Sequence, residues 1–292
     1  MLKINFPVKK EFSNETEIVF DKPILTKNKK EIFDVLRLRR KFLYNIIGLN
    51  GVGKTTFLNI ISLLTGFEGK YFCDSHEESI YVNSHDNLIN KDNTRLNRFS
   101  YIFQDPHILN MYTVEENLRL VNREFDFNTH FERLLSKIEK EICEEYKEYL
   151  IIKLKYLQEQ KDRSPYYLSG GEKQLLSFIR AMINPSNAIF ADEPWASMDQ
   201  KLKNFVEQEL YLYLTNNDTF AEFRQKKKFS KNNIVVIITH KHHHYNNRFG
   251  SLDKEWTRNI PVINKKNKIK RKSNKLIIER YKPNIQEIKK VH

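Results

Sequence analysis

Residues 43–55 read Leu-Tyr-Asn-Ile-Ile-Gly-Leu-Asn-Gly-Val-Gly-Lys-Thr, and this stretch decides the fold class. The apolar run Leu43–Ile47 is typical of a buried strand that ends at a glycine. Gly48–Thr55 then fits the pattern G-x-x-x-x-G-K-[ST], in which glycines let the backbone curl so that its N–H groups face phosphate oxygens. Apolar residues follow at helical spacing: Phe57, Ile60, Ile61 and Leu64. A strand, a loop and a helix in this order predict a phosphate-binding loop.

The loop residues have distinct predicted roles. Lys54 is expected to contact the β- and γ-phosphates of a nucleotide, and the Thr55 hydroxyl is expected to bind Mg²⁺. The positive N-terminal end of the following helix adds to the attraction for anions. The predicted nucleotide-binding residues are Gly48, Asn50, Gly51, Gly53, Lys54, Thr55 and Thr56.

An acidic pair, Asp192 and Glu193, directly follows the apolar run Ala188–Ala191. A carboxylate at the tip of a buried strand can hold Mg²⁺, so Asp192 is a predicted metal ligand. The next carboxylate can orient and activate an attacking water, which makes Glu193 the predicted catalytic base. Most acidic pairs are merely solvated, but this pair lies in a chain that already has a phosphate-binding loop.

The remaining patterns predict strands that alternate with helices. Short strands are expected at residues 2–6 and 16–20, and a further buried strand is expected at residues 234–238. Residues 113–160 read as charged helices and residues 172–183 as an apolar-periodic helix. This alternation favours an α/β domain with a mostly parallel sheet.

The segment Tyr167-Leu-Ser-Gly-Gly-Glu-Lys-Gln174 resembles the signature of the ATP-binding cassette (ABC) ATPase family, Leu-Ser-Gly-Gly-Gln/Glu. Its serine and glycines are expected to open a helix and to form a second anion-binding helix N-terminus. The resemblance implies that this end contacts the γ-phosphate of ATP held by another protomer. The residues implied in that contact are Ser169, Gly170, Gly171 and Glu172.

Three further residues resemble conserved parts of the same family. Gln104, in Phe-Gln-Asp-Pro, would sense Mg²⁺ and the attacking water. Asp199, in Ser-Met-Asp, would couple the two sites of a dimer. His240, which follows Thr239 at the end of the strand 234–238, would contact the γ-phosphate.

The resemblance also implies the architecture. We expect a P-loop NTPase (RecA-like) core with a mostly parallel sheet, an N-terminal antiparallel β subdomain and a helical subdomain at about 107–168. The nucleotide-binding domain would span residues 1–250. Residues 251–292 would be a basic tail or appendage.

The positive charge is unevenly distributed along the chain. The net charge is +13, and residues 254–292 hold 13 Lys and Arg against three Glu, a surplus of +10. A solvated tail is the simpler interpretation, and contact with nucleic acid or an anionic membrane face is the alternative.

The expected function is that of an ATPase with the cofactors ATP and Mg²⁺, which dimerises with a second cassette around two nucleotides. No run of about 18 apolar residues occurs, so a separate transmembrane permease subunit would be the partner in transport. The protein would then act in the cytoplasm, at the inner face of the membrane. The alternatives are an ABC-type ATPase that acts on nucleic acid, translation or defence, and a cassette that binds ATP without turnover.

Overall fold

The computed structural model describes residues 17–20, 36–39, 41–62, 64, 71–73, 99–141, 144–186, 188–224, 233–239, 250–263 and 269–283. The predicted strand at residues 2–6 and His240, the predicted contact of the γ-phosphate, lie outside these ranges. Within the described ranges, no helix combines the length and the apolar character that a membrane span requires.

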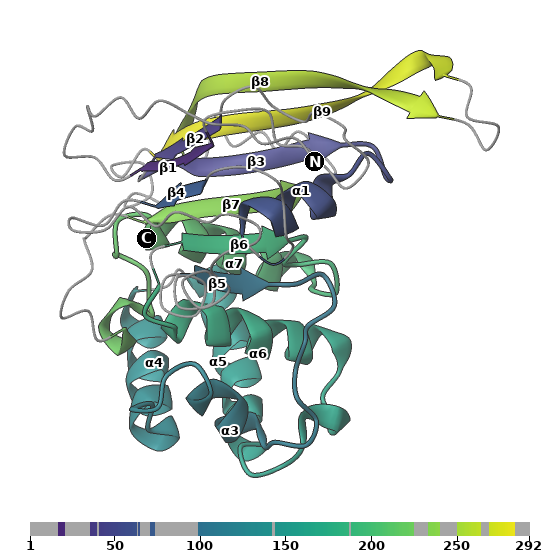
Figure 1. Cartoon of the computed structure of the whole chain (residues 1–292). Helices are drawn as coiled ribbons and strands as arrows, with labels where there is room; N and C mark the ends of the chain where they lie inside the picture. Colours follow the sequence, from purple (N-terminus) through teal and green to yellow (C-terminus); the bar gives the residue numbers. More distant parts are fainter. Residues whose placement is uncertain are drawn as a thin grey trace.

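A six-stranded sheet forms the centre of the molecule, in the order β5-β6-β7-β3-β9-β8 (Figure 1). The four strands β5, β6, β7 and β3 run parallel, and β9 and β8 are antiparallel additions beside β3. This confirms the predicted mostly parallel sheet. The bounds of the parallel strands are Leu43–Gly48 for β3, Phe99–Ile102 for β5, Ala188–Asp192 for β6 and Ile234–Thr239 for β7.

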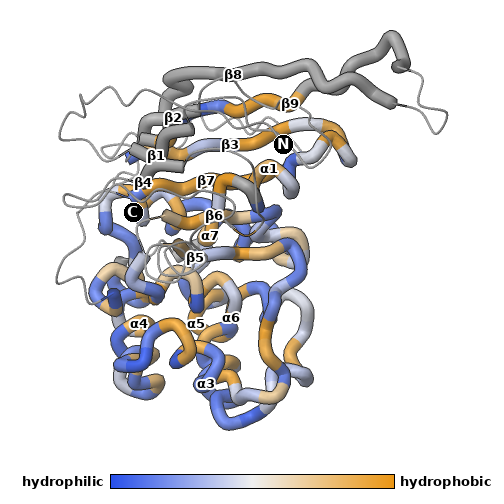
Figure 2. Tube along the Cα trace, viewed as in Figure 1, coloured by the Kyte–Doolittle hydropathy of each residue, from blue (hydrophilic) through white to orange (hydrophobic). Residues whose placement is uncertain are grey.

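Both faces of this sheet are covered, because successive side chains of a strand point to opposite faces. On β6, Ala188 and Phe190 pack with α1 residues such as Phe57, whereas Ile189 and Ala191 pack with the helices of the other face. The strands β6 and β7 are therefore buried along their whole length. Such continuous apolar strands are typical of a parallel sheet between two layers (Figure 2).

The helices divide into those that flank the sheet and those that extend away from it (Figure 1). The flanking helices are α1 (Lys54–Ile61), α6 (Gly170–Ile183) and α7 (Gln200–Tyr213). The extending helices are α3 (Val114–Arg119), α4 (Phe127–Glu141) and α5 (Glu144–Glu159). Two short 3-10 turns, η1 (Pro165–Tyr167) and η2 (Ala221–Phe223), also lie in the described ranges. The extending group is the predicted helical subdomain, and it packs on α6 and α7 through α3 and α5.

A second, three-stranded antiparallel sheet has the order β2-β1-β4. Its strands are β1 (Glu17–Phe20), β2 (Leu36–Arg39) and β4 (Tyr71–Cys73). All three come from the first quarter of the chain, as expected for the N-terminal antiparallel β subdomain.

The two C-terminal strands, β8 (Gly250–Ile263) and β9 (Ile269–Pro283), form a hairpin that joins the main sheet. β9 pairs with β3 from Leu43 opposite Tyr281 to Gly48 opposite Leu276. These strands lie in the segment 251–292, where the charge distribution predicted a tail or appendage, but the structure builds them into the sheet. A count of charges over the segment does not reveal its apolar residues, of which Leu276 and Ile278 are buried.

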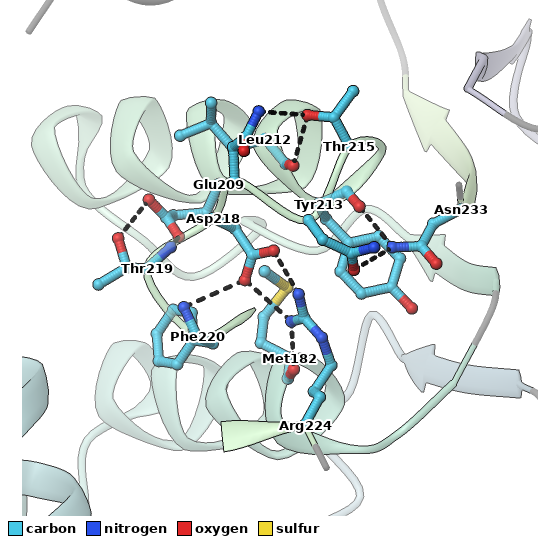
Figure 3. A network of polar contacts seen from close by, with 12 residues as sticks. Met182, Glu209, Leu212, Tyr213, Thr215, Asp218, Thr219, Phe220, Arg224 and Asn233 are labelled. Carbon is cyan, nitrogen blue, oxygen red and sulfur yellow. Dashed lines mark hydrogen bonds and ion pairs between the residues drawn. The ribbon is translucent and has the colours of Figure 1, made fainter. Parts of the chain in front are cut away.

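A buried polar network stabilises the segment after α7 (Figure 3). Asp218 pairs with Arg224, and both side chains are fully buried; Arg224 Nη1 also donates to the Met182 carbonyl oxygen at 2.7 Å. The Glu209 carboxylate accepts hydrogen bonds from the backbone N–H and the hydroxyl of Thr219, both at 2.7 Å. The network ties this segment to α7 and to the C-terminal end of α6.

Candidate nucleotide-binding site

The phosphate-binding loop connects β3 to α1, as the sequence predicts. Gly51 has a φ of +77° and Gly53 a φ of +101°. These left-handed backbone conformations favour glycine, because a Cβ atom would be strained there. The Phe57 N–H donates to the Gly53 carbonyl oxygen at 2.8 Å, so the helical hydrogen bonds begin within the loop. The loop thus turns sharply into the N-terminus of α1.

Lys54 lies at this turn, with a side chain that is 7% exposed. Its Nζ donates to the carbonyl oxygens of Gly48 at 2.8 Å and of Leu49 at 3.4 Å. The ammonium group is therefore held against the loop itself, beside the N-terminal N–H groups of α1. An anion that enters the loop meets a fixed positive charge as well as backbone donors, which suits the phosphates of a nucleotide.

Thr55 and Asp192 meet at the carboxyl ends of β3 and β6. The Thr55 hydroxyl donates to Asp192 Oδ2 at 2.7 Å, and Asp192 is 6% exposed. A hydroxyl and a carboxylate oxygen side by side fit Mg²⁺, which takes few protein ligands and completes its octahedron with water and phosphate oxygens. Among the described residues, no cluster of three or more His, Cys, Asp or Glu offers another metal site.

Glu193 and Gln104 lie next to this pair. Gln104 Nε2 donates to Glu193 Oε2 at 3.4 Å, and the Glu193 N–H donates to the Ile238 carbonyl oxygen at 3.3 Å. Glu193 has a φ of +46°, an uncommon conformation for a residue with a side chain, and such strain is found at functional sites. Thr55, Gln104 and Asp192 also line one cavity of ≈ 340 Å³. The structure therefore brings the four predicted residues together.

The predicted signature forms the N-terminus of α6. Ser169 caps the helix: its N–H donates to Glu172 Oε2 at 2.9 Å, and its hydroxyl accepts from the Glu172 N–H at 3.3 Å. This reciprocal pair is a capping box. Glycine at position 171 avoids a tight contact, because a Cβ there would lie 3.0 Å from the Ser197 carbonyl oxygen.

Asp199 caps α7 and accepts hydrogen bonds from the backbone N–H groups of Lys201 and Leu202, both at 3.0 Å. The Tyr149 hydroxyl also donates to its carboxylate. Burial alone would raise the pKa of Asp199, but the hydrogen bonds from Tyr149, Leu202 and Lys201 outweigh it and lower that pKa. Asp199 is therefore a well-held anion at neutral pH.

Gln174 lies five residues after Ser169, and no motif in the sequence predicts a role for it. Its side chain is fully buried, and Nε2 donates to the carbonyl oxygens of Phe103 at 3.1 Å and of Pro194 at 2.9 Å. Gln174 thus links α6 to the turns that carry Gln104 and Glu193. A polar residue within the apolar-periodic helix was the signal that could have identified it.

His240 lies outside the described residues, so its contact with the γ-phosphate stays a prediction. The residue before it, Thr239, is buried and donates its hydroxyl to Asn45 Oδ1 at 2.9 Å. This contact connects the end of β7 to β3, the strand that leads into the phosphate-binding loop.

The family model for the ABC transporter domain matches residues 35–196, which is more than half of the chain. The chain belongs to the ABC transporter family. The family predicted from the sequence is thereby confirmed.

Relatives in this family have both import and export names. The putative hemin import ATP-binding protein HrtA of Staphylococcus haemolyticus is 32% identical over 55% of this chain and 65% of its own length. The carnitine transport ATP-binding protein OpuCA of Listeria monocytogenes is 32% identical over 56% of this chain and 36% of its length. The macrolide export ATP-binding/permease protein MacB of Campylobacter jejuni is 34% identical over 53% of this chain and 22% of its own length. The match thus spans less than two thirds of each relative.

Solved structures support the fold. A dimeric bacterial ABC transporter cassette aligns with 77% of this chain and 88% of its own length. The TM-score is 0.51 at 22% sequence identity. A bacterial Atm1-family ABC exporter with ATP bound aligns with 83% of this chain and 37% of its own length. The TM-score is 0.53 at 16% sequence identity. Likeness at these identities establishes that this ABC cassette has the fold of the family.

Proposed function

We propose that this ABC cassette binds ATP with Mg²⁺, hydrolyses it, and uses the energy to drive transport through a separate transmembrane subunit. The observation that carries the proposal is the Thr55–Asp192 contact of 2.7 Å beside Lys54, Glu193 and Gln104. Lys54 supplies a positive charge, and Thr55 and Asp192 supply two magnesium ligands. Glu193 supplies the base, and the amide of Gln104 orients this base. The chemistry of phosphoryl transfer needs mainly such positioning and charge stabilisation.

Each residue has one task in the proposed hydrolysis. Lys54 stabilises the charge of the β- and γ-phosphates, and the oxygens of Thr55 and Asp192 hold the metal. When bound, ATP and Mg²⁺ supply the transferred phosphoryl group and the cation that neutralises it. Glu193 orients the attacking water and accepts its proton on a carboxylate oxygen, which Gln104 keeps in place through its hydrogen bond.

We further propose that the active site is shared between two cassettes. Within one chain, the polar contacts of the phosphate-binding loop join Thr55 to Asp192, whereas those of the signature join Ser169 to Glu172. The exposed helix end at Ser169 is available to the nucleotide of a second cassette, where its N–H groups would stabilise the γ-phosphate. The dimeric state of a structural neighbour agrees with this proposal.

Transport is the function that the surface near the site supports. Apolar side chains are exposed directly after the Gln104 turn: Leu109 at 42%, Met111 at 85% and Tyr112 at 37%. A ≈ 550 Å³ hollow lined by Phe99, Leu120 and Arg180, among others, adjoins the helical subdomain. Exposed apolar groups are typical of an interaction surface, and a permease subunit is the proposed partner. This would place the chain at the inner face of a membrane.

The experiment compares the ATPase rates of the wild type, Glu193→Gln and Lys54→Met, each co-expressed with a candidate multi-span permease subunit. We expect the membrane protein to co-purify, Glu193→Gln to bind ATP without turnover, and Lys54→Met to lose ATP binding. Hydrolysis by Glu193→Gln at the wild-type rate would contradict the assignment of the base. Co-purification with RNA or DNA in a salt-sensitive manner, and without a membrane protein, would contradict transport and favour the nucleic-acid alternative.

A further inference from the structure

The helix α5 contacts both of the segments that the proposed function assigns to the nucleotide of the second cassette. Tyr149 donates its hydroxyl to the Asp199 carboxylate, and Lys153 Nζ lies 3.3 Å from Glu172 Oε1. Residues four positions apart lie on the same face of a helix. One face of α5 therefore holds the signature and the Asp199 turn at the same time.

The two segments also touch each other. A Cβ atom on Gly170 would lie 3.7 Å from the Ser197 Cβ, and one on Gly171 would lie 3.0 Å from the Ser197 carbonyl oxygen. Ser197 is two residues before Asp199, so the N-terminus of α6 packs directly on the Asp199 turn. The signature, the Asp199 turn and α5 thus form one packed unit with contacts along all three sides.

The electrostatics of the unit keep these contacts in place at neutral pH. Burial, together with the hydrogen bond to Asp199, raises the pKa of Tyr149 to about 12, so its hydroxyl remains a donor. Burial alone would raise the pKa of Glu172, but hydrogen bonds from Ser169 and the ion pair with Lys153 outweigh it and lower that pKa. Both acceptors are therefore ionised, and hydrogen bonds to ionised groups are the stronger kind.

We infer that Tyr149 and Lys153 are positioning residues, through which α5 sets the placement of Ser169–Glu172 and Asp199 as one unit. The inference rests on the proposed function, because that function makes these segments act on the partner's nucleotide. Since α5 belongs to the helical subdomain, a displacement of this subdomain carries both segments together. A partner that moves α5 would then control both contacts across the dimer through two side chains.

The test uses the double variant Tyr149→Phe/Lys153→Met, which removes both contacts and keeps the ring and the length of the side chains. Its matched control is Tyr146→Phe/Lys155→Met on the same helix, where Tyr146 contacts Asn204 and Lys155 is exposed. The first measurement is hydrogen exchange of the full-length chain with saturating ATP. We expect the amides of residues 169–172 and 197–202 to exchange about three- to tenfold faster in the test variant, and unchanged in the control.

The second measurement places both double variants in the Glu193→Gln background and records the protein concentration at which ATP induces dimers. We expect about a tenfold higher concentration for the test variant, restoration of most of the loss by Tyr149→Phe/Lys153→Arg, and unchanged ATP affinity of the monomer. Exchange and dimerisation equal to the control would overturn the inference, as would faster exchange spread over the whole chain. If Glu193→Gln alone does not dimerise with ATP, the proposed function fails, and the exchange measurement still decides the role of α5.

Discussion

At the scale of single residues, the site joins positions that are far apart in the chain. Thr55 and Asp192 are separated by 137 positions and meet at 2.7 Å. The sequence predicted both residues because each follows an apolar run that is typical of a buried strand. The carboxyl ends of parallel strands share one edge of a sheet, and ligands bind at this edge. The strained backbone of Glu193, with a φ of +46°, could not be predicted, because tertiary contacts impose it.

Gln174 leads to the first prediction. Its amide bridges the carbonyl oxygens of Phe103 and Pro194, so the change Gln174→Leu leaves one buried and one part-buried acceptor without this donor. A buried group that loses its partner costs about 1–3 kcal/mol, so we expect the free energy of unfolding in urea to fall by about that amount.

The same change should also lower the turnover number more than the affinity for ATP, because Gln174 holds the turns of Gln104 and Glu193 rather than the phosphate-binding loop. The partly exposed Gln158 on α5 offers the control Gln158→Leu. Equal stability and turnover for the two variants would show that Gln174 has no positioning role.

At the scale of elements, the C-terminal hairpin is where charge counting and structure differ. Leu276 and Ile278 on β9 are buried in the cluster around α1, whereas Ile277 between them is partly exposed. We predict that Leu276→Ala and Ile278→Ala each lower the free energy of unfolding by about 2–5 kcal/mol, as in other buried positions. Ile277→Ala should cost clearly less. Three equal and small losses would mean that β9 is a dispensable addition to the sheet.

The network after α7 leads to a prediction about pH. Burial, together with the nearby Asp218, raises the pKa of Glu209 to about 8 from its ordinary value of 4.5. Between these values the folded protein holds a proton that the unfolded chain releases. The stability from Glu209 is therefore fully present below about pH 4.5 and is lost as the pH rises through about 8.

The variant Glu209→Gln removes this titration. We expect the free energy of unfolding of the wild type, measured relative to this variant, to decrease by about 3 kcal/mol between pH 5.5 and pH 8.5. Urea unfolding of both proteins at several pH values measures this difference in the free energy of unfolding. Parallel pH profiles would mean that Glu209 titrates normally in the folded protein.

At the scale of the whole molecule, the sequence predicted more of the core than of its periphery. The three buried strands and the two motif-bearing helices follow from apolar runs beside recognisable loops. The hairpin was hidden because its few apolar residues, such as Leu276 and Ile278, lie within a segment that is mainly basic and polar. The contacts of α5 with Glu172 and Asp199 were also hidden, because Tyr149 and Lys153 belong to a charged helix without a motif, and only packing brings these residues together.

The active site that we propose is larger than one chain, because the signature of a second cassette would complete the half that the phosphate-binding loop supplies. The direct test is the molar mass of Glu193→Gln in solution with saturating ATP and Mg²⁺, beside Glu193→Gln/Ser169→Arg as control. We predict twice the 35.1 kDa of the chain for the first variant and 35.1 kDa for the second. A mass of 35.1 kDa for Glu193→Gln, with ATP bound to every chain at the concentrations used, would contradict the shared site.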